Sequence, residues 1–224
     1  EMNFVGPGHF YVVDELTDQQ GTVSVAMAYL PSANAIMING GFLKYLLTER
    51  RPNIAVKISG IFRAIIHELS HATEAICDRR LITGVRWLLT GHRHTLYSST
   101  KAGEHPISDT LELFNEGMKE CIADRVAEEY IRRFSLRCPD GSVLSIADYQ
   151  DSISAMGGFL GGKGYDIARL FIEQLSEHIA HLCEVPKETV FNAFVRANFR
   201  GNPLPEGLLD KTVGKGFTYA VTQT

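Results

Sequence analysis

The stretch AVKISGIFRAIIHELSHATEAI, residues 55–76, decides how the rest of the chain is interpreted. Its large apolar residues recur at i, i+3 and i+4 spacing, which predicts an amphipathic helix with one apolar face. These residues are Ile58, Ile61, Phe62, Ile65, Ile66, Leu69 and Ile76. We expect this helix to separate a strand-rich beginning, residues 1–50, from a helical body over residues 55–200.

Upstream of this helix, the sequence has the pattern of a small sheet. Segments 9–16, 22–30 and 33–39 are short, apolar and bounded by turn residues, which favours three strands. We expect them to form an antiparallel sheet, with a short helix around residues 42–49.

Downstream, helical periodicity returns over residues 110–134 and 165–183, and a further helix is predicted to begin at Pro186 and end before Gly201. Segment 91–109 is polar and rich in Ser, Thr, His and Gly. We expect it to be a long loop that borders a cleft as a lid, since such loops are usually functional. Segment 201–224 has the composition of a loosely packed tail. The predicted fold is α+β, in a single domain over residues 1–224.

Composition and charge limit the possible partners. The 224 residues are 45% hydrophobic and 21% charged, with a formal net charge of -4, which excludes a disordered chain and gives no basic footprint for nucleic acid. We find no apolar segment long enough to span a membrane and no secretory signal. A cytoplasmic location is therefore expected, although the chain begins with Glu1 and delivery or secretion as part of a longer protein stays open. The oligomeric state is not indicated.

The most informative motif is His67-Glu68-Leu69-Ser70-His71, an HExxH pattern inside the predicted helix. Histidines at i and i+4 project from one helix face, so that both imidazoles can bind one Zn²⁺ at about 2.0–2.1 Å. Glu68 points roughly 100° around the helix from His67, beside the metal and not on it. There it can act as a general base toward water.

A third ligand is expected from the helix over residues 110–134, which contains Asn115-Glu116-Gly117-Met118-Lys119-Glu120. Glu116 and Glu120 are also i, i+4, so they share one helix face. If the two helices pack together, Glu116 can complete a His-His-Glu set with His67 and His71. Glu120 can then accept a hydrogen bond from a ligand imidazole. Glu120 itself and Glu74 are alternative third ligands.

An HExxH motif followed by a helical Asn-Glu-Gly resembles the gluzincin group of zinc metallopeptidases. The resemblance implies a zincin-like body in which His67, His71 and Glu116 bind zinc, Glu68 is the general base and Glu120 supports a zinc histidine. It also implies a polypeptide substrate that pairs in extended form with an edge strand, which would be segment 33–39.

Peptide hydrolysis also needs a donor for the developing oxyanion. Tyr165 is the preferred candidate because it opens a helix after a glycine-rich turn at residues 161–164. Further candidates are the loop residues His92, His94, Tyr97 and His105.

Other functions compete with this interpretation. Residues 157–164 fit a GxxxxGK phosphate-binding pattern, but Gly164 stands where a Ser or Thr is required. Glu68 and His71 form an ExxH pair, as in di-iron bundles, but a second such pair is missing from the sequence. A zinc-dependent amide hydrolase of a non-peptide substrate and a non-hydrolytic metal-binding helical protein remain alternatives.

Overall fold

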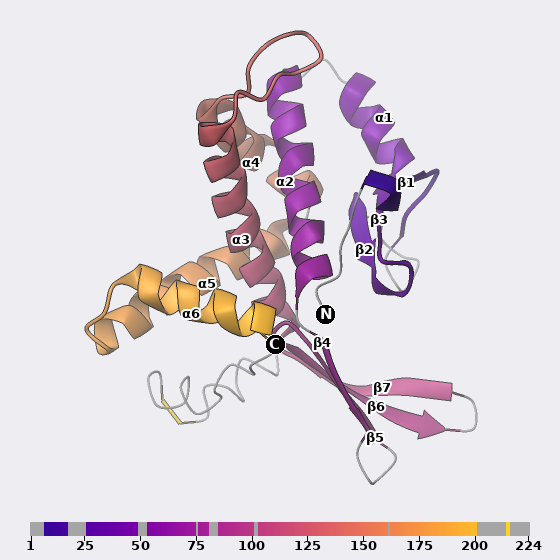
Figure 1. Cartoon of the computed structure of the whole chain (residues 1–224), viewed down its shortest axis with the longest axis vertical. Helices are drawn as coiled ribbons and strands as arrows, with labels where there is room; N and C mark the ends of the chain where they lie inside the picture. Colours follow the sequence, from indigo (N-terminus) through magenta and orange to yellow (C-terminus); the bar gives the residue numbers. More distant parts are fainter. Residues whose placement is uncertain are drawn as a thin grey trace. The chain divides into compact units, whose positions relative to one another are not determined.

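The computed structural model describes residues 7–17, 26–48, 53–74, 76–80, 85–100, 103–160, 162–200 and 214–215. The fold is α+β, as predicted (Figure 1). Its strands are β1 (Phe10–Val13), β2 (Met27–Leu30), β3 (Ala35–Asn39), β4 (Ile76–Arg80), β5 (Val85–Thr90), β6 (Arg93–Thr100) and β7 (Gly103–Thr110). Its α-helices are α1 (Gly40–Thr48), α2 (Ile54–Thr73), α3 (Glu112–Arg133), α4 (Ile146–Leu160), α5 (Gly162–Leu182) and α6 (Lys187–Arg200).

The chain divides into two compact units. The first contains the described residues up to Ala72 and those from Lys119 to Asp166. The second contains those from Thr73 to Met118 and from Ile167 onward. Helix α3 contributes its first residues to the second unit and its longer part to the first. The prediction of one domain over residues 1–224 stays a prediction.

The sheet of the first unit is mixed, and the prediction of an antiparallel sheet with segment 33–39 at its edge was wrong. The strand order is β1-β3-β2, with β1 parallel and β2 antiparallel to the central β3. A tight turn over Pro31–Ala33, closed by Asn34 in the left-handed region at φ 47°, pairs β2 with β3. Only the far side of β3 is then left for β1, so among the described strands β3 is central and β1 and β2 are the two edges.

The core of the first unit forms where α2 packs against the longer part of α3 (Figure 1). Its buried residues are Ile66, Ala123, Ala127, Ile131 and Tyr149. Small alanines on α3 let the two helices approach closely, because they add little side-chain volume between the helix axes. Phe62 and Tyr130 extend the contact, with ring centroids 5.5 Å apart.

Helix α4 was not predicted from the sequence. It begins at a capping box in which the Ser145 hydroxyl accepts the Asp148 backbone N–H, while the Asp148 carboxylate accepts the Ser145 backbone N–H at 3.0 Å. The Tyr149 side chain, fully buried, then fixes this helix on the α2–α3 core.

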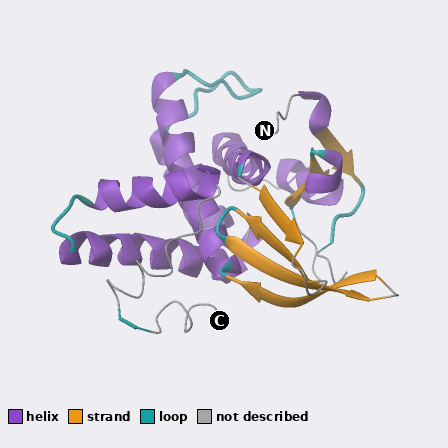
Figure 2. Ribbon diagram, turned by 60° about the horizontal axis from the view of Figure 1, so that its bottom comes forward, coloured by secondary structure: helices purple, strands orange, loops and turns teal. Residues whose placement is uncertain are grey.

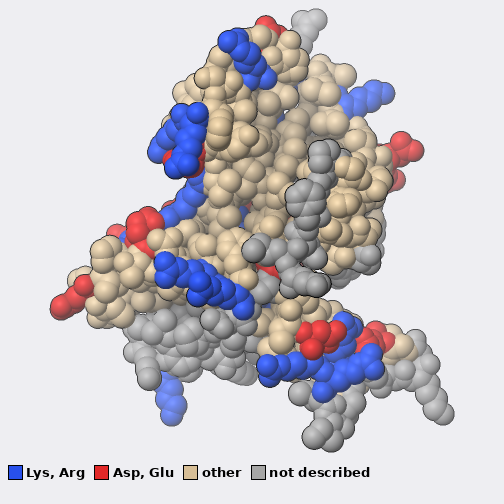
Figure 3. Space-filling model, viewed as in Figure 1, with Lys and Arg blue, Asp and Glu red and all other residues tan. Residues whose placement is uncertain are grey.

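The second unit contains an antiparallel sheet in the order β4-β5-β6-β7. The prediction of a long loop over residues 91–109 was therefore wrong, because this segment forms β6 and most of β7. This polar segment can form strands because ion pairs between neighbouring strands stabilise the sheet in addition to its apolar contacts. Arg86 on β5 donates to both carboxylate oxygens of Asp78, at 2.9 and 2.8 Å, and to Glu104 at 2.7 Å. Figure 3 shows acidic and basic side chains intermingled over this sheet.

Helices α5 and α6 form a neighbouring pair in the second unit (Figure 2). Their bounds agree with the predicted helices over residues 165–183 and from Pro186. The predicted tail over residues 201–224 lies outside the described residues, apart from Gly214 and Lys215. Among the described helices, none has the length and apolar composition that a membrane span requires.

The first turns of α3 lie close to α5 at Gly117. A Cβ at this position would lie 2.5 Å from the Ala168 carbonyl oxygen and 2.9 Å from Ile172 Cγ1. Glycine is therefore needed here to allow the two helices to pack.

Gly117→Ala should lower the free energy of unfolding by about 1–3 kcal/mol, because the new methyl group overpacks the α3–α5 contact. This loss should appear although alanine favours a helix over glycine by roughly 1 kcal/mol. Urea unfolding of the purified variant measures the change. Gly8→Ala is the matched control, because a Cβ at Gly8 meets nothing within 4 Å. Equal stability of the two variants would contradict the close approach.

Candidate metal centre

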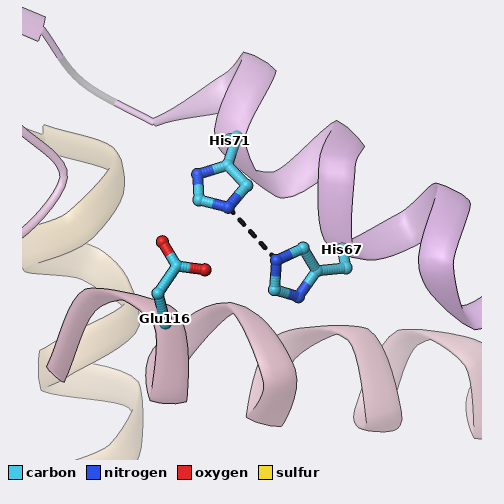
Figure 4. A group of neighbouring side chains, drawn as sticks. All are labelled: His67, His71 and Glu116. Carbon is cyan, nitrogen blue, oxygen red and sulfur yellow. Dashed lines mark hydrogen bonds between the residues drawn. The ribbon is translucent and has the colours of Figure 1, made fainter. Parts of the chain in front are cut away.

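Helix α2 places His67 and His71 one turn apart on the same face, as the HExxH spacing predicts. Their Nε2 atoms lie 3.2 Å from each other and point into the same space (Figure 4). Two nitrogens bound tetrahedrally to one zinc ion at about 2.0–2.1 Å would lie roughly 3.3–3.4 Å apart. The histidine pair therefore has the spacing that a zinc ion requires.

The third member of the group is Glu116 on α3. One ligand atom from each of His67, His71 and Glu116 lies within 4.8 Å of the others. His67 is buried, whereas His71 and Glu116 are half-buried. Figure 4 shows the three side chains directed toward one another from the two helices. Two imidazoles and one carboxylate match the donor set of hydrolytic zinc sites that keep one coordination position open.

Glu120 contacts the other nitrogen of His67. Its Oε1 lies 2.8 Å from His67 Nδ1, and the carboxylate is buried. Burial alone would raise the pKa of Glu120, but the His67 hydrogen bond and the charges of His67 and Arg63 outweigh it and hold the pKa below its usual value. With this carboxylate 2.8 Å from Nδ1, a neutral His67 is expected to carry its proton on Nδ1, which would leave the Nε2 lone pair directed at His71 and Glu116.

Glu68 is half-buried beside the histidines, and its Oε2 accepts the backbone N–H of Tyr29 at 2.7 Å. This N–H belongs to the edge strand β2. The Tyr29 hydroxyl in turn donates to Asn34 Oδ1 at 2.9 Å, in the β2–β3 turn. The carboxylate next to the candidate metal site is thus fixed to the strand edge by one of its two oxygens.

The residues on either side of Glu116 have structural roles that sequence reasoning missed. Asn115 is buried, and its Oδ1 accepts the backbone N–H of His92 at 2.9 Å. Gly91, which precedes His92, has φ +60°, so the β5–β6 turn depends on glycine. The Asn115 side chain satisfies a buried backbone N–H of this turn. No sequence pattern predicts this contact, because Asn115 and His92 are 23 positions apart.

Glu74, an alternative third ligand, is buried against this asparagine. Its Oε2 accepts Asn115 Nδ2 at 3.4 Å. It does not belong to the group formed by His67, His71 and Glu116. The other alternative, Glu120, has both carboxylate oxygens engaged, one by His67 and one by Arg63.

The prediction of an oxyanion donor stays a prediction, and only His92, Tyr97 and His105 among its candidates have described side chains. Tyr165 lies in the first turn of α5, but its side chain is outside the described residues, as is that of His94. His92 is buried, with Nε2 3.1 Å from the Phe194 carbonyl oxygen. Tyr97 on β6 stacks with Arg86, whose Cζ lies 5.6 Å from the ring centroid, and His105 is exposed.

Arg63 was not predicted to have a role. It precedes His67 by one helical turn, is buried, and donates to both Glu120 and Asp124. The signal that could have found it is an arginine at i−4 from a motif histidine, on the same helix face.

Comparison with protein-family models gave no match. Searches of the curated proteins and of the solved structures gave no similar protein either. The function therefore has to be inferred from the geometry of the site.

Removing a ligand should remove metal binding. Each of His67→Ala and Glu116→Gln should weaken zinc binding at least about 100-fold, because two protein ligands cannot complete the tetrahedral set. Titration of metal-free protein against a chromophoric chelator gives the affinity. His181→Ala on α5 is the matched control, since His181 is exposed. If either variant kept the zinc affinity of the control, that residue would not be a ligand.

Proposed function

We propose that the protein hydrolyses peptide bonds in a zinc-dependent reaction. The observation that supports this most strongly is the His67–His71–Glu116 group, with two Nε2 atoms 3.2 Å apart and a carboxylate within 4.8 Å. A structural zinc site is usually closed by four protein ligands, whereas three ligands leave a position for water or substrate. Glu68 beside the group supports a hydrolytic role over a structural one.

A zinc ion held by these three residues would lower the pKa of a bound water and polarise the substrate carbonyl. Glu68 supplies the proton transfer. Its carboxylate takes a proton from the attacking water and then delivers it to the leaving amine. Glu120 holds the His67 ring so that Nε2 stays directed toward the metal.

An extended polypeptide is the substrate that this site favours, and β2 is the strand along which it would bind. The Asn39 N–H donates to the Ala26 carbonyl oxygen at 2.9 Å, so by the antiparallel alternation the backbone groups of Met27 and Tyr29 face away from β3. A peptide strand added at this edge would therefore pass Glu68, which already accepts the Tyr29 N–H.

Glu68→Gln should bind zinc with nearly unchanged affinity and lose peptide hydrolysis by roughly 100-fold or more, because an amide cannot accept the proton of water. Cleavage of a peptide library, measured with and without a chelator, gives the activity. Glu177→Gln is the control, because Glu177 is an exposed helix glutamate that pairs only loosely with Lys187 at 3.9 Å.

Three outcomes would contradict the proposal. They are full activity of Glu68→Gln, chelator-resistant cleavage by the wild-type protein, and two irons per chain in place of one zinc. Cleavage of non-peptide amides without cleavage of any peptide would favour the amide hydrolase instead.

A further inference from the structure

The polar contacts around Glu120 continue beyond the metal group through a connected series of buried and half-buried side chains. Arg63 Nη2 donates to Glu120 Oε2, and Arg63 Nε donates to Asp124 Oδ1 at 2.6 Å. The Tyr149 hydroxyl donates to the same Asp124 oxygen at 2.6 Å. The series thus runs from Tyr149 through Asp124, Arg63 and Glu120 to His67.

We propose that Arg63 is a positioning residue of the metal site, which fixes the Glu120 carboxylate and thereby the orientation and tautomer of His67. This inference rests on the proposed zinc chemistry but concerns metal affinity, which is measured separately from hydrolysis.

The first support for this role is the arrangement of contacts at the Glu120 carboxylate. Glu120 has two oxygens, and Arg63 and His67 each take one of them. The carboxylate therefore cannot rotate without losing one of its partners. Arg63 is itself fixed, because its planar guanidinium uses separate nitrogens for Glu120 and Asp124.

Burial strengthens the argument. Arg63 has 8% of its surface exposed, Glu120 has 5%, and Tyr149 is fully buried. An arginine that serves only solubility or a surface ion pair would be exposed to solvent. Arg132 is such a case, because its side chain is 59% exposed in the pair with Glu128. A buried cation needs buried acceptors, and here one of the acceptors is the carboxylate that contacts a metal-binding histidine.

The test measures the zinc affinity of chelator-treated protein by competition with a chromophoric chelator. Arg63→Met should weaken zinc binding about 10- to 100-fold, the usual effect of losing a partner of a metal ligand. Arg63→Lys retains the charge, but one ammonium group cannot replace the two guanidinium nitrogens that bind the two carboxylates. Its zinc affinity should therefore fall by more than about twofold, but by less than that of Arg63→Met. Arg132→Met, which removes an exposed arginine from a Glu pair on α3, should keep the wild-type affinity.

A double-mutant cycle shows whether Arg63 acts through Glu120. In a Glu120→Ala background, Arg63→Met and Arg63→Lys should change zinc affinity less than about twofold, because the connecting carboxylate is gone. In the metal-free protein at pH 8, ¹⁵N imidazole spectra should show His67 protonated at Nδ1 in the wild type. The Nε2–H form should increase in Arg63→Met.

The outcomes separate the two proposals. Unchanged affinity in either Arg63 variant, or an equal loss with and without Glu120, overturns the role of Arg63. If Arg63→Met does not fold, Arg63→Lys decides by the same two measurements. A wild-type protein that binds no zinc overturns the proposed function instead, before any Arg63 variant is compared.

Discussion

The buried carboxylate of Glu120 is the constraint on which the site depends. It lies on α3, and its two oxygens contact His67 and Arg63, which lie one turn apart on α2. Separating these partners would leave a charge in the core, a change that typically costs about 3–5 kcal/mol. The apolar contacts alone would tolerate small shifts of α2 along α3, because alanines face it there. The ionic contacts do not tolerate such shifts.

The same contact determines where Glu116 lies. Phe62 contacts Tyr130, Arg63 contacts Asp124, and His67 contacts Glu120, so α2 and α3 run in opposite directions. One turn forward on α2 from His67 is His71, and one turn back on α3 from Glu120 is Glu116. Two i, i+4 pairs on antiparallel helices therefore face each other. Glu120 contacts one histidine, and Glu116 joins both histidines in the candidate metal group.

Helical periodicity predicted α2, α3, α5 and α6 because each has an apolar stripe, and the HExxH spacing predicted the histidine pair. The sheet over β4–β7 could not be found in this way, because its strands are held by cross-strand ion pairs such as Arg86 with Asp78 and Glu104. Segment 33–39 was predicted to be an edge strand, but it forms the central strand β3. Strand order could not be predicted because the sequence does not show on which side of β3 the strand β1 pairs. Asn115 and Arg63 were missed because their partners His92 and Glu120 lie 23 and 57 positions away in the sequence.

The position of β2 connects the corrected sheet order to the chemistry. A glutamate side chain has three rotatable bonds, so a general base needs a fixed partner to stay beside the reacting water. Glu68 finds this partner in a backbone N–H that only an edge strand can offer, because a central strand uses its N–H groups on both sides. Had β3 been the edge, β2 would have had no N–H free for Glu68. The mixed sheet is thus what brings a strand edge to the proposed base, and the turn at Asn34, which receives the Tyr29 hydroxyl, fixes this strand in register.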